Sequence, residues 1–291
     1  MENVNGIITK NVTGLFREKT TDSEQVTQAI MGQPVRIEKE EDDWMWVETW
    51  DAYHGWIMSR NVSRGVPRPE LIATVTSLFT DALQQPRRYS EIHTKLVITT
   101  TLEVLANKRN LKRVKMLDGT EAWALDFAEE HKDLVHARMP DGTEAWVVTQ
   151  DVKIAPAGEE NLPLGPDPAS LVRTAKRFLG VPYLWGGTSP FGIDCSGFMQ
   201  LVYKLNGVQL LRDANMQAED PRATPVDKDR LSAGDMVFFA GGQDKTKITH
   251  VGMTCGDGAF VHSAGQGRGV VTNNLTDEPY DRNYLGARRM P

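Results

Sequence analysis

The sequence predicts a multidomain chain in which two small all-β barrels are followed by an α+β domain. Short segments of alternating hydrophobicity, separated by turn-rich stretches, fill the first 155 residues. Stretches rich in Pro and Gly at 66–69 and 155–166 are typical of linkers. Beyond residue 167, helical periodicity comes first and strand signals follow, which favours an α+β domain. The predicted domains cover residues 1–66, 70–155 and 167–291.

Composition and charge exclude several classes of protein. The 291 residues are 40% hydrophobic and 25% charged, as in an ordinary globular protein. The net charge of -6 provides no basic surface for nucleic acid. No apolar run approaches the roughly 20 residues that span a bilayer. We therefore expect neither nucleic acid nor membrane among the partners.

The cysteines and the N terminus bear on the cellular compartment. Cys195 and Cys255 allow one disulfide but no disulfide framework. The first five residues are polar and lack the basic and apolar regions of a signal peptide. The N terminus therefore favours the cytoplasm, whereas a leader removed ahead of Met1 would indicate a periplasmic or extracellular protein.

The first barrel is predicted from three short strands. Residues 33–38 alternate as in a half-buried strand, 44–48 follow, and a turn-rich 51–54 precedes 55–57. The chain here resembles a bacterial SH3-like domain. The residues that carry this resemblance are Gln28, Gly32, Val35, Trp44, Val47, Tyr53, Gly55 and Trp56.

A second SH3-like barrel with an extra hairpin is predicted over residues 70–155. Residues 12–18 are echoed at 75–81, and 96–104 are rich in strand-forming Val, Ile and Thr. A closer repeat, 116–123 and 139–146, places Asp-Gly between apolar segments, which is a hairpin signal. A helix over 70–84 is the alternative, although its Thr and Val content argues against it. We expect the indole rings of Trp56, Trp123 and Trp146 in the barrel cores rather than on a ligand platform.

The third domain opens with two predicted helices. Asp167 can cap the first, Pro168 suits its first position, and Leu171, Ala175 and Phe178 line one face. The second begins at Cys195, and Phe198, Leu201, Val202 and Leu205 recur at helical spacing before Gly207. A thiol in the first turn of a helix meets unpaired N–H groups, which favour the nucleophilic thiolate. The alternative is a small buried apolar Cys.

Strand signals at 236–239, 250–255 and 259–263 follow the helices. The turn Gly256-Asp257-Gly258 brings His262 back toward His250. If both rings lie on one face, Cys195 can act as nucleophile, His250 as general base and His262 as the residue that holds the His250 ring. Two alternatives stay open: a zinc site without close ligand pairs, or two unrelated histidines. We predict no metal and no cofactor, and we expect Cys255 in the core.

Ordered motifs in this domain resemble those of the NlpC/p60 cysteine peptidases, whose papain-like fold and Cys-His-His set the resemblance implies. The order of two SH3-like domains before the peptidase resembles that of the γ-D-glutamyl-L-diamino acid endopeptidases, or dipeptidyl peptidases VI. The motifs are Val181-Pro182-Tyr183-Leu184-Trp185-Gly186-Gly187, Asp194-Cys195-Ser196-Gly197, Gly234-Asp235-Met236-Val237-Phe238-Phe239, His250-Val251-Gly252 and His262-Ser263.

The same resemblance implies further site residues. Tyr183 would stand beside the thiol with a hydroxyl for the oxyanion, or would only pack against a helix end. In relatives of this architecture, acids and a Tyr hold the free amine of the substrate. Asp194 could instead only cap the helix, and Trp185 could line the cleft or the core. The candidates for holding the amine are Asp194, Ser196 and Asp213, with Glu24 and Tyr53 from the first barrel.

The expected function is therefore that of a cysteine endopeptidase in murein peptide recycling. It would cut the γ-D-Glu–L-diamino acid bond of short muropeptides that carry a free N-terminal L-Ala, and it would act as a monomer. A stop for the free amine needs carboxylates, because a buried ammonium without a partner is costly. The alternatives are a peptidoglycan-binding protein and another amidase or acyltransferase on the same fold. The preference for lysine or diaminopimelate is left open.

Overall fold

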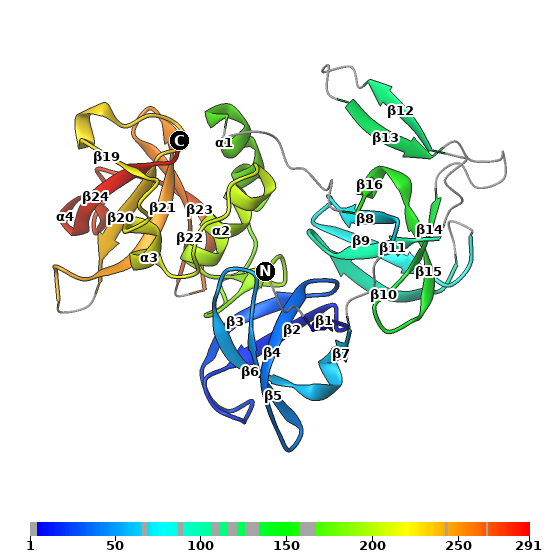
Figure 1. Ribbon diagram of the computed structural model, residues 1–291. Helices are drawn as coiled ribbons and strands as arrows, with labels where there is room; N and C mark the ends of the chain where they lie inside the picture. The colour runs from blue at the N-terminus through cyan, green and yellow to red at the C-terminus, as the bar shows by residue number, and fades with distance from the viewer. Residues whose placement is uncertain are drawn as a thin grey trace. The chain divides into compact units, whose positions relative to one another are not determined.

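The computed structural model describes residues 5–65, 69–86, 90–105, 111–115, 121–125, 134–157, 167–241, 244–265 and 267–291 (Figure 1). Contacts divide the chain into two compact units. The first comprises Met1–Glu24, Gln28–Trp50 and His54–Asn161, and the second comprises Gln25–Thr27, Asp51–Tyr53 and Leu162–Pro291. The predicted linker residues 66–68 and 158–166 lie outside the described residues, and the predicted domain limits stay a prediction.

The N-terminal strands form an antiparallel sheet in the order β3-β2-β6-β5-β4-β1-β7, drawn in blue to cyan in Figure 1. Inward-pointing residues such as Leu15, Val47 and Ile57 are fully buried, as strand alternation requires. The strands are β1 (Gly6–Ile8), β2 (Val12–Phe16), β3 (Gln25–Ile30), β4 (Pro34–Glu41), β5 (Trp44–Glu48), β6 (His54–Met58) and β7 (Val62–Arg64), with a 3-10 turn at Ser59–Asn61.

The second antiparallel sheet has the order β10-β9-β15-β14-β11-β8-β16-β13-β12. Its core includes Val75, Leu96, Leu102 and Val147. The strands are β8 (Leu71–Val75), β9 (Phe79–Leu83), β10 (Ile92–Val97), β11 (Thr101–Val104), β12 (Leu111–Lys115), β13 (Glu121–Leu125), β14 (Leu134–Arg138), β15 (Glu144–Val148) and β16 (Val152–Pro156), with a 3-10 turn at Thr149–Asp151.

In the second sheet one disfavoured alternative is excluded, and two details differ from the prediction. The alternative helix over 70–84 is wrong, because β8 and β9 occupy that stretch. Residues 12–16 form one strand, whereas the echoed 75–79 span a strand end and a turn, so the echo is not a structural repeat. The predicted strand 96–104 is divided by a turn at Thr99, whose φ is +69°. Turn geometry therefore overrides strand propensity there.

The Asp-Gly prediction is confirmed for the second copy of the closer repeat. β14 and β15 pair directly, and Gly142 has the positive φ of 88° that a tight turn favours. In the first copy β12 pairs with β13, but the turn Asp118-Gly119 lies outside the described residues, as does the side chain of Trp123.

The prediction that Trp56 and Trp146 lie in the barrel cores is wrong. Both side chains are half-buried on outward faces of their sheets. The Trp56 ring packs against Trp46 with 5.4 Å between centroids, and Trp146 stacks on His136 at 4.3 Å. The cause is the strand alternation itself, because Gly55 and Ile57, or Ala145 and Val147, take the inward positions.

The second unit combines helices with a six-stranded antiparallel sheet in the order β19-β24-β20-β21-β22-β23, drawn in yellow to red in Figure 1. The predicted fold class, all-β followed by α+β, is confirmed. The elements are α1 (Pro168–Lys176), β17 (Thr188–Ser189), β18 (Gly192–Ile193), α2 (Cys195–Leu205), α3 (Ala214–Ala218), β19 (Thr224–Val226), a 3-10 turn at Lys228–Arg230, β20 (Met236–Ala240), β21 (Ile248–Gly256), β22 (Ala259–Ala264), β23 (Gly269–Asn274), α4 (Tyr280–Asn283) and β24 (Tyr284–Arg289).

The two predicted helices are present with the expected ends. Asp167 caps α1 by accepting a 2.8 Å hydrogen bond from the Ser170 amide, and Pro168 is its first residue. α2 begins at Cys195, and Gly207 follows its end with φ of 88°. Among the described residues, no helix has the length and hydropathy to cross a bilayer.

The hairpin of β21 and β22 is also as predicted, with its turn at Asp257-Gly258. A bulge between Thr254 and Gly256 interrupts the strand before that turn. Cys255 is consequently half-exposed rather than in the core, and both cysteines are free thiols.

Candidate active site

Cys195 is the first residue of α2 and lies buried, with 7% of its surface exposed. α2 packs on β21 and β22, the strands that carry the two histidines. Backbone amides of Val251 and Ser196 hydrogen bond to the Cys195 sulfur. The sulfur therefore lies directly beside the residue that follows His250.

The thiol does not have the lowered pKa that its helix position predicts. Burial, and after it the charge of Asp194, raises the pKa of Cys195 to about 12. The amides of Val251 and Ser196 and the charge of Arg212 act in the opposite direction but are outweighed. The free site therefore holds a neutral thiol, and a base must take its proton during the reaction.

His250 and His262 converge on one face of the hairpin. Their Nε2 and Nδ1 atoms lie 2.7 Å apart, with the rings edge to face. Nε2 of His262 lies 3.0 Å from Oδ1 of Asn273 on β23. Because the two ring nitrogens face each other, they do not face a shared metal, which argues against the zinc alternative.

The hydrogen bonds define which nitrogen carries each proton. Oδ1 of Asn273 is an acceptor, so His262 donates from Nε2 and keeps a lone pair on Nδ1. His250 then donates from Nε2 to that lone pair. The remaining lone pair of His250 is on Nδ1, the nitrogen available to accept a proton.

Aromatic packing keeps both imidazoles neutral. The His262 ring is fully buried and stacks on Phe260 at 4.6 Å, and Phe239 lies 5.9 Å from the His250 ring. Burial, with the nearby His262 and Arg268, lowers the pKa of His250 to about 3. Burial also lowers the pKa of His262 to about 4, against the effect of Asn273. A neutral imidazole is the form that acts as a base.

Gly252 makes room for this arrangement. A Cβ at this position would lie 2.7 Å from the Phe260 ring and 3.0 Å from Cβ of His262. The His250-Val251-Gly252 motif therefore has a steric explanation, because only glycine lets the His262 side chain approach His250.

Tyr183 and Trp185 lie on the segment ahead of Cys195. Tyr183 is half-buried, and its pKa is raised first by burial and then by the negative charges of Cys195 in its thiolate form and of Asp194. Its hydroxyl is therefore a neutral hydrogen-bond donor, close enough to Cys195 for its pKa to respond to a thiolate there. The Trp185 side chain is 61% exposed, so it is not a core residue, and its carbonyl accepts a 3.0 Å hydrogen bond from Gln25.

A buried Arg that the sequence analysis missed organises the residues around Cys195. Arg212 is 1% exposed and pairs with the carboxylate of Asp194. It also donates to the hydroxyls of Ser196, at 3.0 Å, and Thr27, at 2.9 Å. Asp194 caps α2 as well, accepting from the Gly197 amide at 2.7 Å. The roles of Asp194 and Ser196 as ligands of a substrate amine stay predictions, because Arg212 already contacts both.

Asp213 and Tyr53 come together within the second unit. The Tyr53 hydroxyl lies 3.1 and 3.3 Å from the two carboxylate oxygens of Asp213. Glu24 belongs to the first unit, where its carboxylate pairs with Arg17 at 2.6 Å. Its role at the amine end stays a prediction.

Two residues that shape the site, Arg212 and Asn273, are not among the residues predicted from the sequence. Arg212 could have been suspected as a lone cation after the apolar Leu210-Leu211. Asn273 could not, because its contact with His262 depends on the register of β22 and β23, in which Phe260 lies opposite Asn273.

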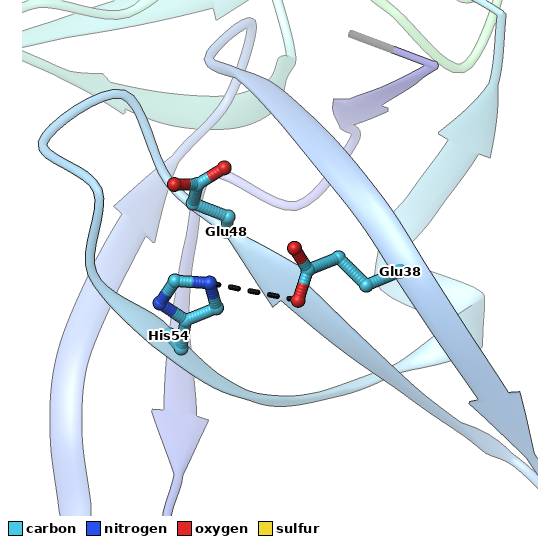
Figure 2. A group of neighbouring side chains, drawn as sticks. All are labelled: Glu38, Glu48 and His54. Carbon is cyan, nitrogen blue, oxygen red and sulfur yellow. Dashed lines mark ion pairs between the residues drawn. The ribbon is translucent and has the colours of Figure 1, made fainter. Parts of the chain in front are cut away.

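A separate cluster in the first unit carries donors that suit a divalent metal (Figure 2). Glu38, Glu48 and His54 come from neighbouring strands, with their ligand atoms within 4.8 Å of one another, and His54 faces Glu38 at 3.5 Å. Nη2 of Arg36 lies 2.6 Å from Glu38 and 2.5 Å from Glu48, so a protein cation already pairs with both carboxylates. We assign the cluster to cross-strand charge pairing.

Comparisons with protein families agree with this geometry. Residues 180–289 match the NlpC/P60 family, and this span contains Cys195, His250 and His262. Residues 15–62 match the bacterial dipeptidyl-peptidase Sh3 domain.

Similar proteins extend over nearly the whole chain. A gamma-D-glutamyl-L-lysine dipeptidyl-peptidase of Bacillus cereus is 33% identical, over 90% of this chain and 74% of the relative. Dipeptidyl-peptidase 6 of Lysinibacillus sphaericus is 28% identical, over 94% of this chain and 93% of that protein. The crystal structure of an NlpC/P60 family protein from Bacillus cereus superposes with a TM-score of 0.78 at 25% identity, over 99% of this chain and 100% of that one. The chain therefore belongs to the NlpC/P60 family and is a cysteine peptidase.

Proposed function

We propose that this peptidase hydrolyses the γ-D-Glu–L-diamino acid bond of short muropeptides whose N-terminal L-Ala has a free amine. A peptidoglycan-derived peptide substrate follows from the relatives, two of which are named for dipeptidyl-peptidase activity. The restriction to a free amine is carried by one observation, the pairing of Tyr53 with Asp213 in the same unit as Cys195.

The distance along the chain supports this pairing as the amine end of the site. Asp194 precedes Cys195, Arg212 precedes Asp213, and Asp194 and Arg212 are ion-paired. Neighbouring Cα atoms are about 3.8 Å apart, so Asp213 and Cys195 are each one residue away from a partner of this ion pair. Asp213 therefore lies near the nucleophile. The Tyr53 hydroxyl donates to Asp213, and a phenolic oxygen is also able to accept a hydrogen bond from an ammonium group.

The reaction follows from the residues around the thiol. Nδ1 of His250 takes the Cys195 proton as the sulfur attacks the γ-carbonyl of D-Glu, and Tyr183 donates to the oxyanion. The C–N bond then breaks, and the His250 proton passes to the leaving amine of the diamino acid. Water, deprotonated by His250, hydrolyses the thioester, which releases L-Ala-D-Glu and restores the thiol.

The decisive experiment is a product assay by mass spectrometry on L-Ala-γ-D-Glu-L-Lys, its diaminopimelate counterpart and their N-acetylated forms. The free peptides should release the dipeptide, and acetylation should nearly abolish turnover because it removes the ammonium group. Cys195→Ala should be inactive. Equal rates on free and acetylated peptides would refute the amine restriction.

Variants at the amine end sharpen this assay. Tyr53→Phe should raise KM about tenfold and Asp213→Asn more, because each loses a contact with a charged group. Tyr284→Phe is the matched control, since its buried hydroxyl has no hydrogen-bond partner among the described residues.

We further propose that the protein acts as a monomer in the cytoplasm on recycled fragments. Light scattering of the purified chain tests the first statement, and fractionation of cells that express the full gene tests the second. A stable dimer, or the protein in an extracytoplasmic fraction, would contradict the corresponding part.

A further inference from the structure

Arg268 lies on the short loop between β22, which carries His262, and β23, which carries Asn273. Its neighbours Gly267 and Gly269 both have positive φ, of 77° and 67°. The loop end is anchored, because the Val270 amide donates to the Val181 carbonyl at 2.8 Å. A Cβ at Gly269 would collide with that carbonyl. The position of the Arg268 backbone is thus determined by the strand of His262, by the strand of Asn273 and by the segment leading to Tyr183.

The Arg268 side chain is exposed and carries an unneutralised charge. Within the described part of the chain, its guanidinium has no hydrogen-bond or ion-pair partner. This sets it apart from Arg212, whose charge is neutralised by Asp194. A cation beside a catalytic pair, with no acid of its own, is suited to receive an acid from the substrate.

The two arginines act on opposite parts of the site. The charge of Arg268 is felt by His250 and His262, whereas the cation felt by Cys195 and Tyr183 is Arg212. Cys195 holds the acyl part of the substrate, and His250 protonates the leaving amine. Arg268 also lies on the loop that directly follows β22, the strand of His262, so the fold places it on the histidine side of the site, where the leaving amine is protonated.

The leaving group has a carboxylate at the required place. In a tripeptide, the α-carbon bonded to the departing amine also bears a free carboxylate. A longer peptide carries an amide there. A carboxylate between Arg268 and His250 would also offset the repulsion between the guanidinium and the imidazolium that forms during the reaction.

We infer that Arg268 binds the free α-carboxylate of the C-terminal diamino acid, which makes the peptidase selective for tripeptides over peptides extended beyond that residue. This inference rests on the proposed function. The contact is a bidentate, charge-assisted hydrogen bond that Arg can form and Lys can form only in part.

The test compares kcat/KM for L-Ala-γ-D-Glu-L-Lys with that for the same peptide as its C-terminal carboxamide. The wild type should prefer the acid by about tenfold, as expected for a hydrogen bond between charged groups. In Arg268→Ala, kcat/KM for the acid should fall to the level of the carboxamide, whereas kcat/KM for the carboxamide should not change. Arg268→Lys should keep part of the preference for the acid. Arg173→Ala, on the exposed face of α1, should keep the wild-type ratio.

The outcomes separate the two proposals. Equal kcat/KM for acid and amide in the wild type, or an unchanged ratio in Arg268→Ala, would overturn the carboxylate subsite and leave the proposed function standing. If the wild type cleaves neither peptide, the proposed function fails, and the subsite fails with it.

Discussion

The proton arrangement at His250 depends on a residue two strands away. Asn273 accepts from His262, which leaves His262 to accept from His250, and this sequence of contacts presents Nδ1 of His250 as the base. Asn273 touches no reacting atom, so it is a positioning residue. Replacing Asn273 should therefore change kcat and leave substrate binding unchanged.

Asn273→Ala should lower kcat about tenfold and change KM little, because the His262 ring loses the partner that defines its tautomer. Steady-state kinetics on the free tripeptide measure this. Asn274→Ala is the matched control, since the Asn274 side chain is exposed and, among the described residues, makes only a 3.5 Å contact with Asp277. An unchanged kcat in Asn273→Ala would show that Asn273 does not orient the histidines.

The pH dependence of activity should reflect the buried base. The pKa of His250 is lowered to about 3, so the imidazole stays neutral and able to accept a proton well below its ordinary range. The acid limb of kcat/KM should therefore lie below about pH 5.5. A rise centred at 6.5, or one that tracks an ordinary thiol near pKa 8.5, would contradict this assignment.

At the scale of elements, the start of α2 depends on a buried ion pair. Asp194 caps the helix and neutralises Arg212, and Arg212 in turn contacts Ser196 and Thr27. Removing one partner would leave the other charge buried, which costs more than the loss of a cap alone. The pair thus holds the nucleophile's helix to the loop that carries Asp213.

Asp194→Asn should destabilise the protein by about 3 kcal/mol, because Arg212 would remain charged in the interior. Urea unfolding followed by circular dichroism measures the change. The double variant Asp194→Asn, Arg212→Met should recover much of the loss, since no uncompensated charge remains. A loss of about 1 kcal/mol in the single variant would indicate that only the cap matters.

The β21–β22 hairpin makes a second element-scale prediction. Gly252→Ala should lower kcat at least tenfold, because the new methyl group would push His262 or Phe260 away from its position. Gly265→Ala is the matched control, as a Cβ there meets no described atom within 4 Å. The two variants are compared by kcat on the tripeptide, and equal activity would refute the steric argument.

At the scale of the whole molecule, the buried histidines make stability depend on pH. The folded pKa of His262 is lowered to about 4, below the roughly 6.5 of an unfolded chain. The unfolded state therefore binds more protons as the pH falls, so stability is complete above about pH 7 and is lost between about 6.5 and 4. At pH 5 the loss from His262 alone is about 2 kcal/mol.

His262→Gln should accordingly reduce the acid sensitivity of folding. Calorimetric transitions at pH 7 and pH 5 should lie closer together in this variant than in the wild type. Because each protein is compared with itself at the two pH values, any change in stability caused by the substitution at both pH values cancels. An equal drop in both proteins would mean that His262 does not titrate as its burial requires.

The sequence by itself determined the element types and the chemistry of the nucleophile. The Asp167 and Asp194 caps, the periodicity after Cys195 and the Gly256-Asp257-Gly258 turn are local signals, and each corresponds to an element found in the structure. The family resemblance rested on ordered motifs of the same local kind, and the matched family confirms it.

Only the tertiary structure decided which groups meet and in what protonation state. Whether His262 faces His250 depends on strand register, and the contact with Asn273 depends on a second register across the sheet. The helix position of Cys195 predicts a lowered pKa, but burial reverses it, because desolvation depends on every element packed around the sulfur. The inward or outward placement of Trp56 and Trp146 and the partners of Arg212 are non-local in the same way.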